Sequence, residues 1–116
     1  MADFNKTTFG ANIDILKSEI TAAFAMGHLD KTVDAHIMGT TADIRVALKF
    51  KELKKLLDAD NYEEVNSCLG KIAGILNSCE TAKRAAPFGR YNQRIKELQG
   101  MLPIKKYERK YPDRWG

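Results

Sequence analysis

The chain has 116 residues, of which 44% are hydrophobic and 29% charged, a composition that is ordinary for one soluble globular domain. No apolar run approaches the roughly 18 residues that a membrane-spanning helix needs, so we expect no membrane span. The net charge of +4 is unevenly distributed: residues 1–82 have a balance of −3, whereas residues 83–116 carry ten Lys or Arg against three Asp or Glu, a balance of +7.

The two cysteines do not form a disulfide framework. Eleven positions apart on one helix, Cys68 and Cys79 would lie about 16 Å from each other, too far for a disulfide. We interpret them as small buried or half-buried thiols. A zinc site with His28 and His36 lacks the close Cys-x-x-Cys spacing of such sites, so we predict no metal and no cofactor. The start, MADFNKTTFG, does not resemble a secretory signal, and we expect a cytoplasmic protein, of a cell or of an infected host.

The first third of the chain predicts two helices. Residues 1–9 are polar, and we expect them to fray or to drape over the surface. From Ala11 to Met26, apolar residues recur at helical spacing, and Gly27 is placed to end this helix. Asp30 is placed to cap a short second helix, which runs through Met38.

Residues 42–57 predict a third helix, opened by Thr40 and Thr41, with Asp43 placed to favour the helix dipole. Its apolar seam consists of Val46, Phe50, Leu53 and Leu57. We expect three further residues to widen this seam: Ile44, Ala47 and Leu48. The turn that follows, Asp-Ala-Asp-Asn at 58–61, is short and rich in capping residues, and it predicts an antiparallel hairpin with the next helix. Asn61 and Glu64 have the spacing of a capping box.

The stretch from Asn61 to Lys83 carries two stripes on one predicted helix, and we expect it to be central. Its apolar seam has heptad spacing and consists of Val65, Leu69, Ile72, Leu76 and Cys79. A roughly opposite stripe is made of small residues: Ser67, Gly70, Gly74, Asn77 and Thr81. Because glycine in a helix costs about 1 kcal/mol relative to alanine, we expect Gly70 and Gly74 to allow close packing, against the helix at 88–99 or against a second copy in a homo-oligomer.

The last third predicts a fifth helix and a basic tail. Pro87 suits a first helical position, and the apolar side that follows consists of Phe88, Tyr91, Ile95 and Leu98, closed by Gly100 and Pro103. Pro112 prevents a long helix after that. We therefore predict an all-α fold, a compact bundle of about five helices around a central antiparallel hairpin (about 42–57 and 61–83). Residues 1–102 would form a single helical domain and residues 103–116 a basic, aromatic C-terminal tail.

Catalytic motifs are missing from the sequence: there is no Gly-rich phosphate loop, no His-Glu-x-x-His and no Gly-x-Ser-x-Gly. The two histidines are eight positions apart, and neither is paired by spacing with a carboxylate or a thiol. The paired carboxylates Glu63 and Glu64 lie at a helix start, where capping explains them. We therefore predict that the protein is not an enzyme.

Residues 30–50 have the outline of a helix-turn-helix, in which Ala35 and Gly39 have the spacing of the small residue and the turn glycine. In this interpretation, Ile44 and Leu48 anchor the second helix inward. The side chains that would face a DNA groove are Thr40, Thr41, Asp43, Arg45 and Lys49. Asp34 and Arg45 depart from the pattern because each stands where an apolar residue is expected, and an ordinary helical corner is the alternative.

The basic end carries a mixture typical of nucleic-acid binding, because cations attract phosphates and planar rings stack on bases. The predicted contact residues are Arg90, Arg94, Lys105, Lys106, Tyr107, Arg109, Lys110, Tyr111, Arg114 and Trp115. Lys83, Arg84 and Tyr91 belong to the same basic and aromatic mixture. The alternatives are a tail whose aromatic rings fold back onto the helices, and a partner that is a protein or a membrane surface.

The ending YERKYPDRWG, together with the order of the helices, resembles phage DNA-packaging proteins of the terminase small-subunit type. This resemblance implies a helix-turn-helix combined with an oligomerising helical hairpin. The leading hypothesis is a small, non-enzymatic helical protein that binds DNA or RNA through its basic C-terminal third. The alternative is a protein-interaction module: an adaptor, an assembly subunit or a phage-style inhibitor of a host protein. A small-ligand-binding bundle is a third hypothesis.

Overall fold

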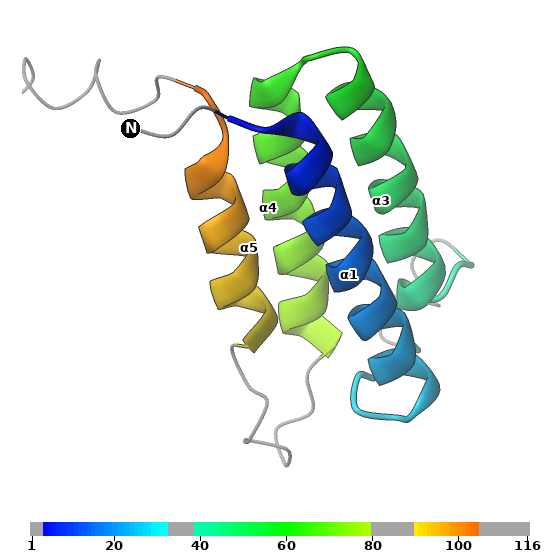
Figure 1. Ribbon diagram of the computed structural model, residues 1–116. Helices are drawn as coiled ribbons and strands as arrows, with labels where there is room; N and C mark the ends of the chain where they lie inside the picture. Colours follow the sequence, from blue (N-terminus) through cyan, green and yellow to red (C-terminus); the bar gives the residue numbers. More distant parts are fainter. Residues whose placement is uncertain (1–3, 33–38, 80–89, 105–116) are drawn as a thin grey trace, which may run out of the picture.

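A computed structural model of the chain describes residues 4–32, 39–79 and 90–104. Regular structure in these ranges is all α-helical and forms a bundle of α1 (Lys6–Ala25), α3 (Ala42–Asp58), α4 (Tyr62–Cys79) and α5 (Arg90–Met101) (Figure 1). α4 lies between α3 and α5 and packs against both, while α1 packs against α3 (Figure 1). The predicted all-α class and the central position of the fourth helix are therefore confirmed.

α1 begins earlier than predicted. Asn5 caps the helix, because its side-chain oxygen accepts a hydrogen bond from the backbone N of Thr8 at 2.9 Å. Phe9 is completely buried in the core. The expectation that residues 1–9 fray is thus wrong from Lys6 onward, because a cap and one apolar anchor hold the first turns. The predicted end is confirmed: helical structure stops at Ala25, and Gly27 has a φ of +82°, which favours glycine.

The second predicted helix lies mostly outside the described residues. Residues 31 and 32 form a turn, and residues 33–38 are not described. Asp30 Oδ1 accepts hydrogen bonds from the backbone N and the hydroxyl of Thr32 at 3.1 and 2.7 Å, but the helix that it was expected to cap lies outside the described residues. These bonds lower the pKa of the Asp30 carboxyl. The described chain therefore supports four helices, and the predicted count of about five is not established.

The central hairpin is confirmed. α3 and α4 form the most extensive helix pair, and both predicted seams are buried along their whole described length. The turn between them includes Asp60 with a left-handed φ of +60°, and Asn61 accepts a hydrogen bond from the backbone N of Glu64 at 3.4 Å. The two seams consist of Val46, Phe50, Leu53 and Leu57 on α3 and Val65, Leu69, Ile72, Leu76 and Cys79 on α4.

The expected widening of the α3 seam is wrong. Ile44 is 50% exposed, Leu48 is 57% exposed, and Ala47 is exposed as well. Ile44 and Leu48 lie two positions before Val46 and Phe50, which is about 200° around the helix axis, so they face away when the seam faces the core. An apolar residue beside a strong seam does not have to be part of it.

α5 closes the bundle through a mixed interface with α4. Its predicted apolar side is buried at Tyr91, Ile95 and Leu98, while Phe88 lies outside the described residues. Gly100 lies inside the helix rather than after it, since α5 continues to Met101. Leu102 is buried and Ile104 packs against the core, so the described chain stays on the bundle up to the point where residues 105–116, which are not described, begin.

None of the described helices combines the length and the apolar character needed to cross a membrane.

The remaining links between the helices are polar and run along the surface. Lys54 of α3 forms an ion pair with Asp14 of α1 at 3.2 Å, and Lys6 of α1 forms one with Asp60 at 2.8 Å. Such exposed pairs orient the helices but add little stability, on the order of 1 kcal/mol or less each.

Candidate functional site

The predicted nucleic-acid contacts are mostly not described. Eight of the ten residues lie between 105 and 116, and Arg90 is the first residue of α5. Arg94 is the predicted contact whose side chain is described, and its Nη1 donates to Glu19 Oε1 of α1. Its side chain is 33% exposed, so it acts as a link between helices. Tyr91 is only 6% exposed and is therefore a core residue, not a stacking platform.

The helix-turn-helix interpretation conflicts with the described half of the motif. Ile44 and Leu48, which that motif would bury, are exposed. Thr41, expected to face a groove, uses its hydroxyl to donate to the carboxylate of Asp43. Lys49 is half-buried and pairs with Glu52 at 3.5 Å. Arg45 is half-buried as well, as are Thr40 and Asp43. The inward anchoring is thus wrong, while Ala35 lies outside the described residues.

Close packing of the two α4 glycines against α5 is also wrong, whereas packing against a second copy is not tested by a single chain. A Cβ added to Gly70 would lie 3.7 Å from Nε2 of Gln99 on α5, an ordinary contact, and one added to Gly74 would meet nothing within 4 Å. Neither position therefore requires glycine for space. The stripe faces solvent at Gly74, and self-association through it stays a prediction.

The two cysteine thiols are buried in the packed core of the bundle. Cys68 is 4% exposed, and its Sγ donates to the backbone oxygen of Lys49 at 3.2 Å. Burial raises the pKa of the Cys68 thiol, which opposes formation of the reactive thiolate. Cys79 is completely buried, and neither cysteine forms a disulfide. Among the described residues, no three His, Cys, Asp or Glu side chains come together as a metal site.

One polar cluster joins the start of α1 to the α3–α4 turn. Asp60 Oδ1 accepts from Lys6 Nζ at 2.8 Å and from the hydroxyl of Tyr62 at 2.9 Å. The hydrogen bond from Lys6, followed by that from Tyr62, lowers the pKa of Asp60, and the bond to Asp60 raises the pKa of Lys6 and of Tyr62. The rings of Phe4 and Tyr62 lie edge to face beside it, with centroids 5.1 Å apart. These contacts hold the start of α1 against the α3–α4 turn.

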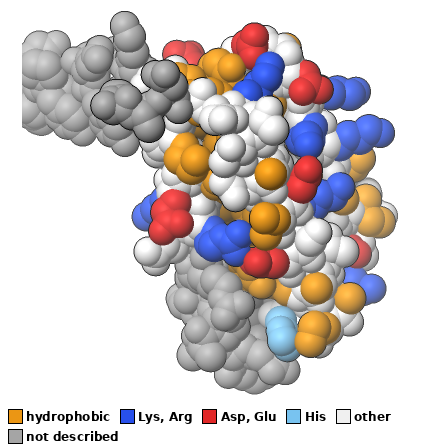
Figure 2. Space-filling model, in the orientation of Figure 1, with side chains coloured by type: hydrophobic (Ala, Val, Ile, Leu, Met, Phe, Trp, Pro, Cys, Tyr) orange, Lys and Arg blue, Asp and Glu red, His pale blue; other side chains and the backbone are white. Residues whose placement is uncertain are grey.

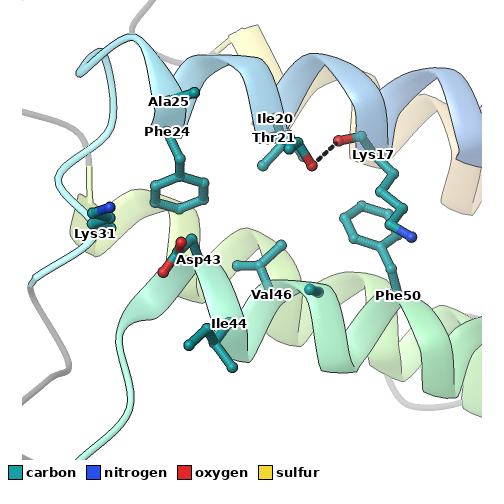
Figure 3. Close-up of a pocket in the computed structure, with 11 residues that line it drawn as sticks. Lys17, Ile20, Thr21, Phe24, Ala25, Lys31, Asp43, Ile44, Val46 and Phe50 are labelled. Carbon is teal, nitrogen blue, oxygen red and sulfur yellow. Dashed lines mark hydrogen bonds between the residues drawn. The ribbon is translucent and has the colours of Figure 1, made fainter.

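A groove runs between α1 and α3. It consists of two hollows of about 330 and 530 Å³ that share Lys17, Ala47 and Phe50. In Figure 3, Ile20 and Phe24 project from α1 and Val46 and Phe50 from α3 toward the space between the helices. The floor of the groove is therefore the outer edge of the hydrophobic core.

Lysines surround this groove. The cations that line it are Lys17, Lys31, Lys51, Lys54 and Lys55, and the carboxylates are Asp14, Asp43 and Asp58. Asp14 is already paired with Lys54, and Asp43 accepts from Thr41. Figure 2 shows Lys and Arg side chains gathered over the α3 side of the molecule, with hydrophobic side chains between them. The groove thus combines an apolar floor with a net positive rim.

Sequence reasoning did not find this groove. A signal was present, since Lys51 and Lys55 are four positions apart on α3 and Asp14 and Lys17 are three apart on α1, each beside a buried seam. The pairing of α1 with α3, which brings the two sets together, is a tertiary feature. Comparison of the chain with protein-family models, curated proteins and solved structures gave no match.

Proposed function

We propose that this is a non-enzymatic helical protein that binds nucleic acid through its basic C-terminal third. The observation that carries the proposal is the charge of +7 on residues 83–116, interleaved with Tyr107, Tyr111 and Trp115. Cations supply attraction to any phosphate backbone, and rings add stacking on unpaired bases. A preference for single-stranded DNA or RNA over duplex is the expected consequence of the ring content.

The described chain supports this proposal at the junction with the bundle. Leu102 is buried and Ile104 packs against the core, so the described chain is anchored to the bundle as far as residue 104. Arg94 is engaged with Glu19, which leaves five cations after residue 104 as the main contacts: Lys105, Lys106, Arg109, Lys110 and Arg114. If these five neutralise phosphates, the slope of log affinity against log salt is about −3 to −5.

The test is fluorescence anisotropy with a labelled single strand and a labelled duplex between about 50 and 300 mM salt. The double variant Lys105→Ala/Lys106→Ala should lower the steepness of the salt dependence by about two. Lys71→Ala, an exposed lysine on α4, is the control and should leave the slope unchanged. Absence of measurable binding to either probe at the lowest salt would refute the proposal.

A protein-interaction module is the second candidate, and the exposed apolar side chains Ile44 and Leu48 favour it. In that function residues 103–116 dock on an acidic partner surface. A stoichiometric complex that survives nuclease treatment and high salt, and that is lost when residues 103–116 are removed, distinguishes it from nucleic-acid binding. Purification with and without nuclease separates the two directly.

A further inference from the structure

We infer that the groove between α1 and α3 is a docking site for an acidic amphipathic helix of a partner protein. Its lining residues all belong to the range 13–58, outside the basic C-terminal third, so the inference does not depend on nucleic-acid binding. The groove combines an apolar strip with unpaired cations, a combination that neither the core of the bundle nor the predicted basic tail requires.

The apolar component is accessible along the groove. Ala25 on α1 and Ala47 and Leu48 on α3 are exposed and lie beside the buried Phe24 and Phe50. Small alanines on both walls let another helix come close, and Leu48, 57% exposed, offers a large apolar contact. Asp43 and Asp58 mark the two ends of the groove on α3, which are 15 positions or about 22 Å apart. That length matches a partner helix of about four turns.

The positive charge on the rim predicts that the partner helix is negatively charged. Lys17, Lys51 and Lys55 are exposed and form no ion pair with any described carboxylate. Lys17 stands on the α1 wall and the other two on α3, so a helix in the groove would meet cations on both flanks (Figure 3 shows Lys17 reaching beside Phe50). Glutamates flanking an apolar stripe complement this arrangement, which is the common helix-in-groove mode of recognition.

Other occupants fit less well. A phosphate backbone would use the lysines but leave the apolar strip without a contact. Residues 105–116 of the chain itself contain five Lys or Arg and two Asp or Glu, so they carry the same sign as the rim. An acidic helix satisfies both components at once.

The test uses two synthetic 15-residue helical peptides with identical leucines at positions 1, 5, 8 and 12, one with glutamate and one with lysine at the flanking positions. Fluorescence anisotropy measures the affinity of each peptide for the full chain. The acidic peptide is expected to bind roughly tenfold or more tightly than the basic one. The variant Lys51→Glu/Lys55→Glu should reverse that preference, while Lys71→Glu/Lys96→Glu, with the same charge change at exposed positions outside the groove, should shift binding by no more than about twofold.

Circular dichroism establishes that each variant remains helical before it is used. Equal affinity for the two peptides, no binding of either, or an equal effect of the two double variants would overturn the inference. So would a homodimer that dissociates on Leu48→Glu, because the occupant would then be a second copy. Loss of oligonucleotide binding in Lys51→Glu/Lys55→Glu with no effect on the acidic peptide would reassign the groove to nucleic acid.

Discussion

The two interfaces of α4 differ in chemistry. Against α3, the buried side chains are apolar, and the one hydrogen bond described there is from Cys68 Sγ to the backbone of Lys49. Against α5, polar side chains meet: Asn92 Nδ2 donates to Asn77 Oδ1 at 2.6 Å, and Gln99 Nε2 donates to the backbone oxygen of Asn66 at 3.0 Å. Two buried oxygens there, Asn66 Oδ1 and Asn92 Oδ1, have no partner among the described residues.

This difference indicates where the bundle is strong. Burying a leucine or isoleucine contributes about 1.5–3 kcal/mol, whereas a buried carbonyl without a partner costs about 1–3 kcal/mol. The α3–α4 hairpin is therefore the more stable unit, and the net free energy that holds α5 on α4 is smaller. Since α5 leads into the basic residues after 104, the segment proposed to bind nucleic acid follows the more weakly held of the two helices that pack on α4.

The largest expected effect comes from shortening a side chain in the apolar interface between α3 and α4. Leu69→Ala, at a completely buried position of α4, should lower the free energy of unfolding by about 3–4 kcal/mol. Leu98→Ala on α5, where the side chain is 6% exposed, should cost about 2 kcal/mol. Urea unfolding, monitored by circular dichroism, measures the free energy of unfolding of both variants. An equal or larger loss for Leu98→Ala would show that α5 is held as firmly as the hairpin.

A smaller effect should follow from making the polar interface more apolar. Asn66→Leu removes a buried oxygen that lacks a partner and improves helix propensity, while the backbone oxygen that Gln99 contacts remains. The free energy of unfolding should rise by about 1 kcal/mol. The control is Ser67→Leu at the exposed neighbouring position, which reports propensity alone. Destabilisation by Asn66→Leu would mean that the oxygen makes a favourable interaction.

The exposed face of α4 should respond more weakly still. Gly74→Ala should raise the free energy of unfolding by about 0.8–1 kcal/mol, because the added Cβ meets nothing within 4 Å. Gly27→Ala, where φ is +82°, should lower it by about 1 kcal/mol. Thermal unfolding compares the two. If Gly74→Ala destabilises or alters the size of the particle in solution, the face packs against a second copy.

The smallest effect is expected at the turn of the hairpin. The pKa of Asp60 is lowered in the folded state by its bonds from Lys6 and Tyr62, so its contribution to stability is present above the ordinary carboxyl range and is lost as pH falls through the lowered value. Asp60→Asn, which also tolerates the φ of +60°, should be slightly less stable at pH 7 and should lose less stability below about pH 4.

The measurement is the urea midpoint between pH 3 and pH 7 for the wild type and the variant. Glu63→Gln is the matched control, because it removes an exposed carboxylate from the adjacent helix start and leaves the Lys6–Asp60–Tyr62 cluster intact. Parallel pH curves for wild type and Asp60→Asn would contradict this role of the cluster.

The periodicity of the sequence was sufficient to locate the four described helices and most of the residues that face the core. Heptad spacing in the stretch after Asn61 and four-three spacing after Ala42 identified the two central seams, and both are buried as expected, although the spacing did not exclude Ile44 and Leu48 from the α3 seam. The four-residue turn between them allowed only an antiparallel hairpin. The early start of α1 was missed because its anchor, Phe9, is a single apolar residue among polar ones.

The features that follow from how the helices sit against each other required the tertiary structure. Ile44 and Leu48 are apolar in the sequence, and only the packing of α1 and α4 on α3 leaves them in solvent. The lysine-rimmed groove exists because α1 lies beside α3, which brings Lys17 near Lys51 and Lys55. Local spacing determines which face of a helix is apolar, because it depends on the 3.6-residue repeat alone. Which helix covers that face, and what remains open, depends on contacts between distant residues.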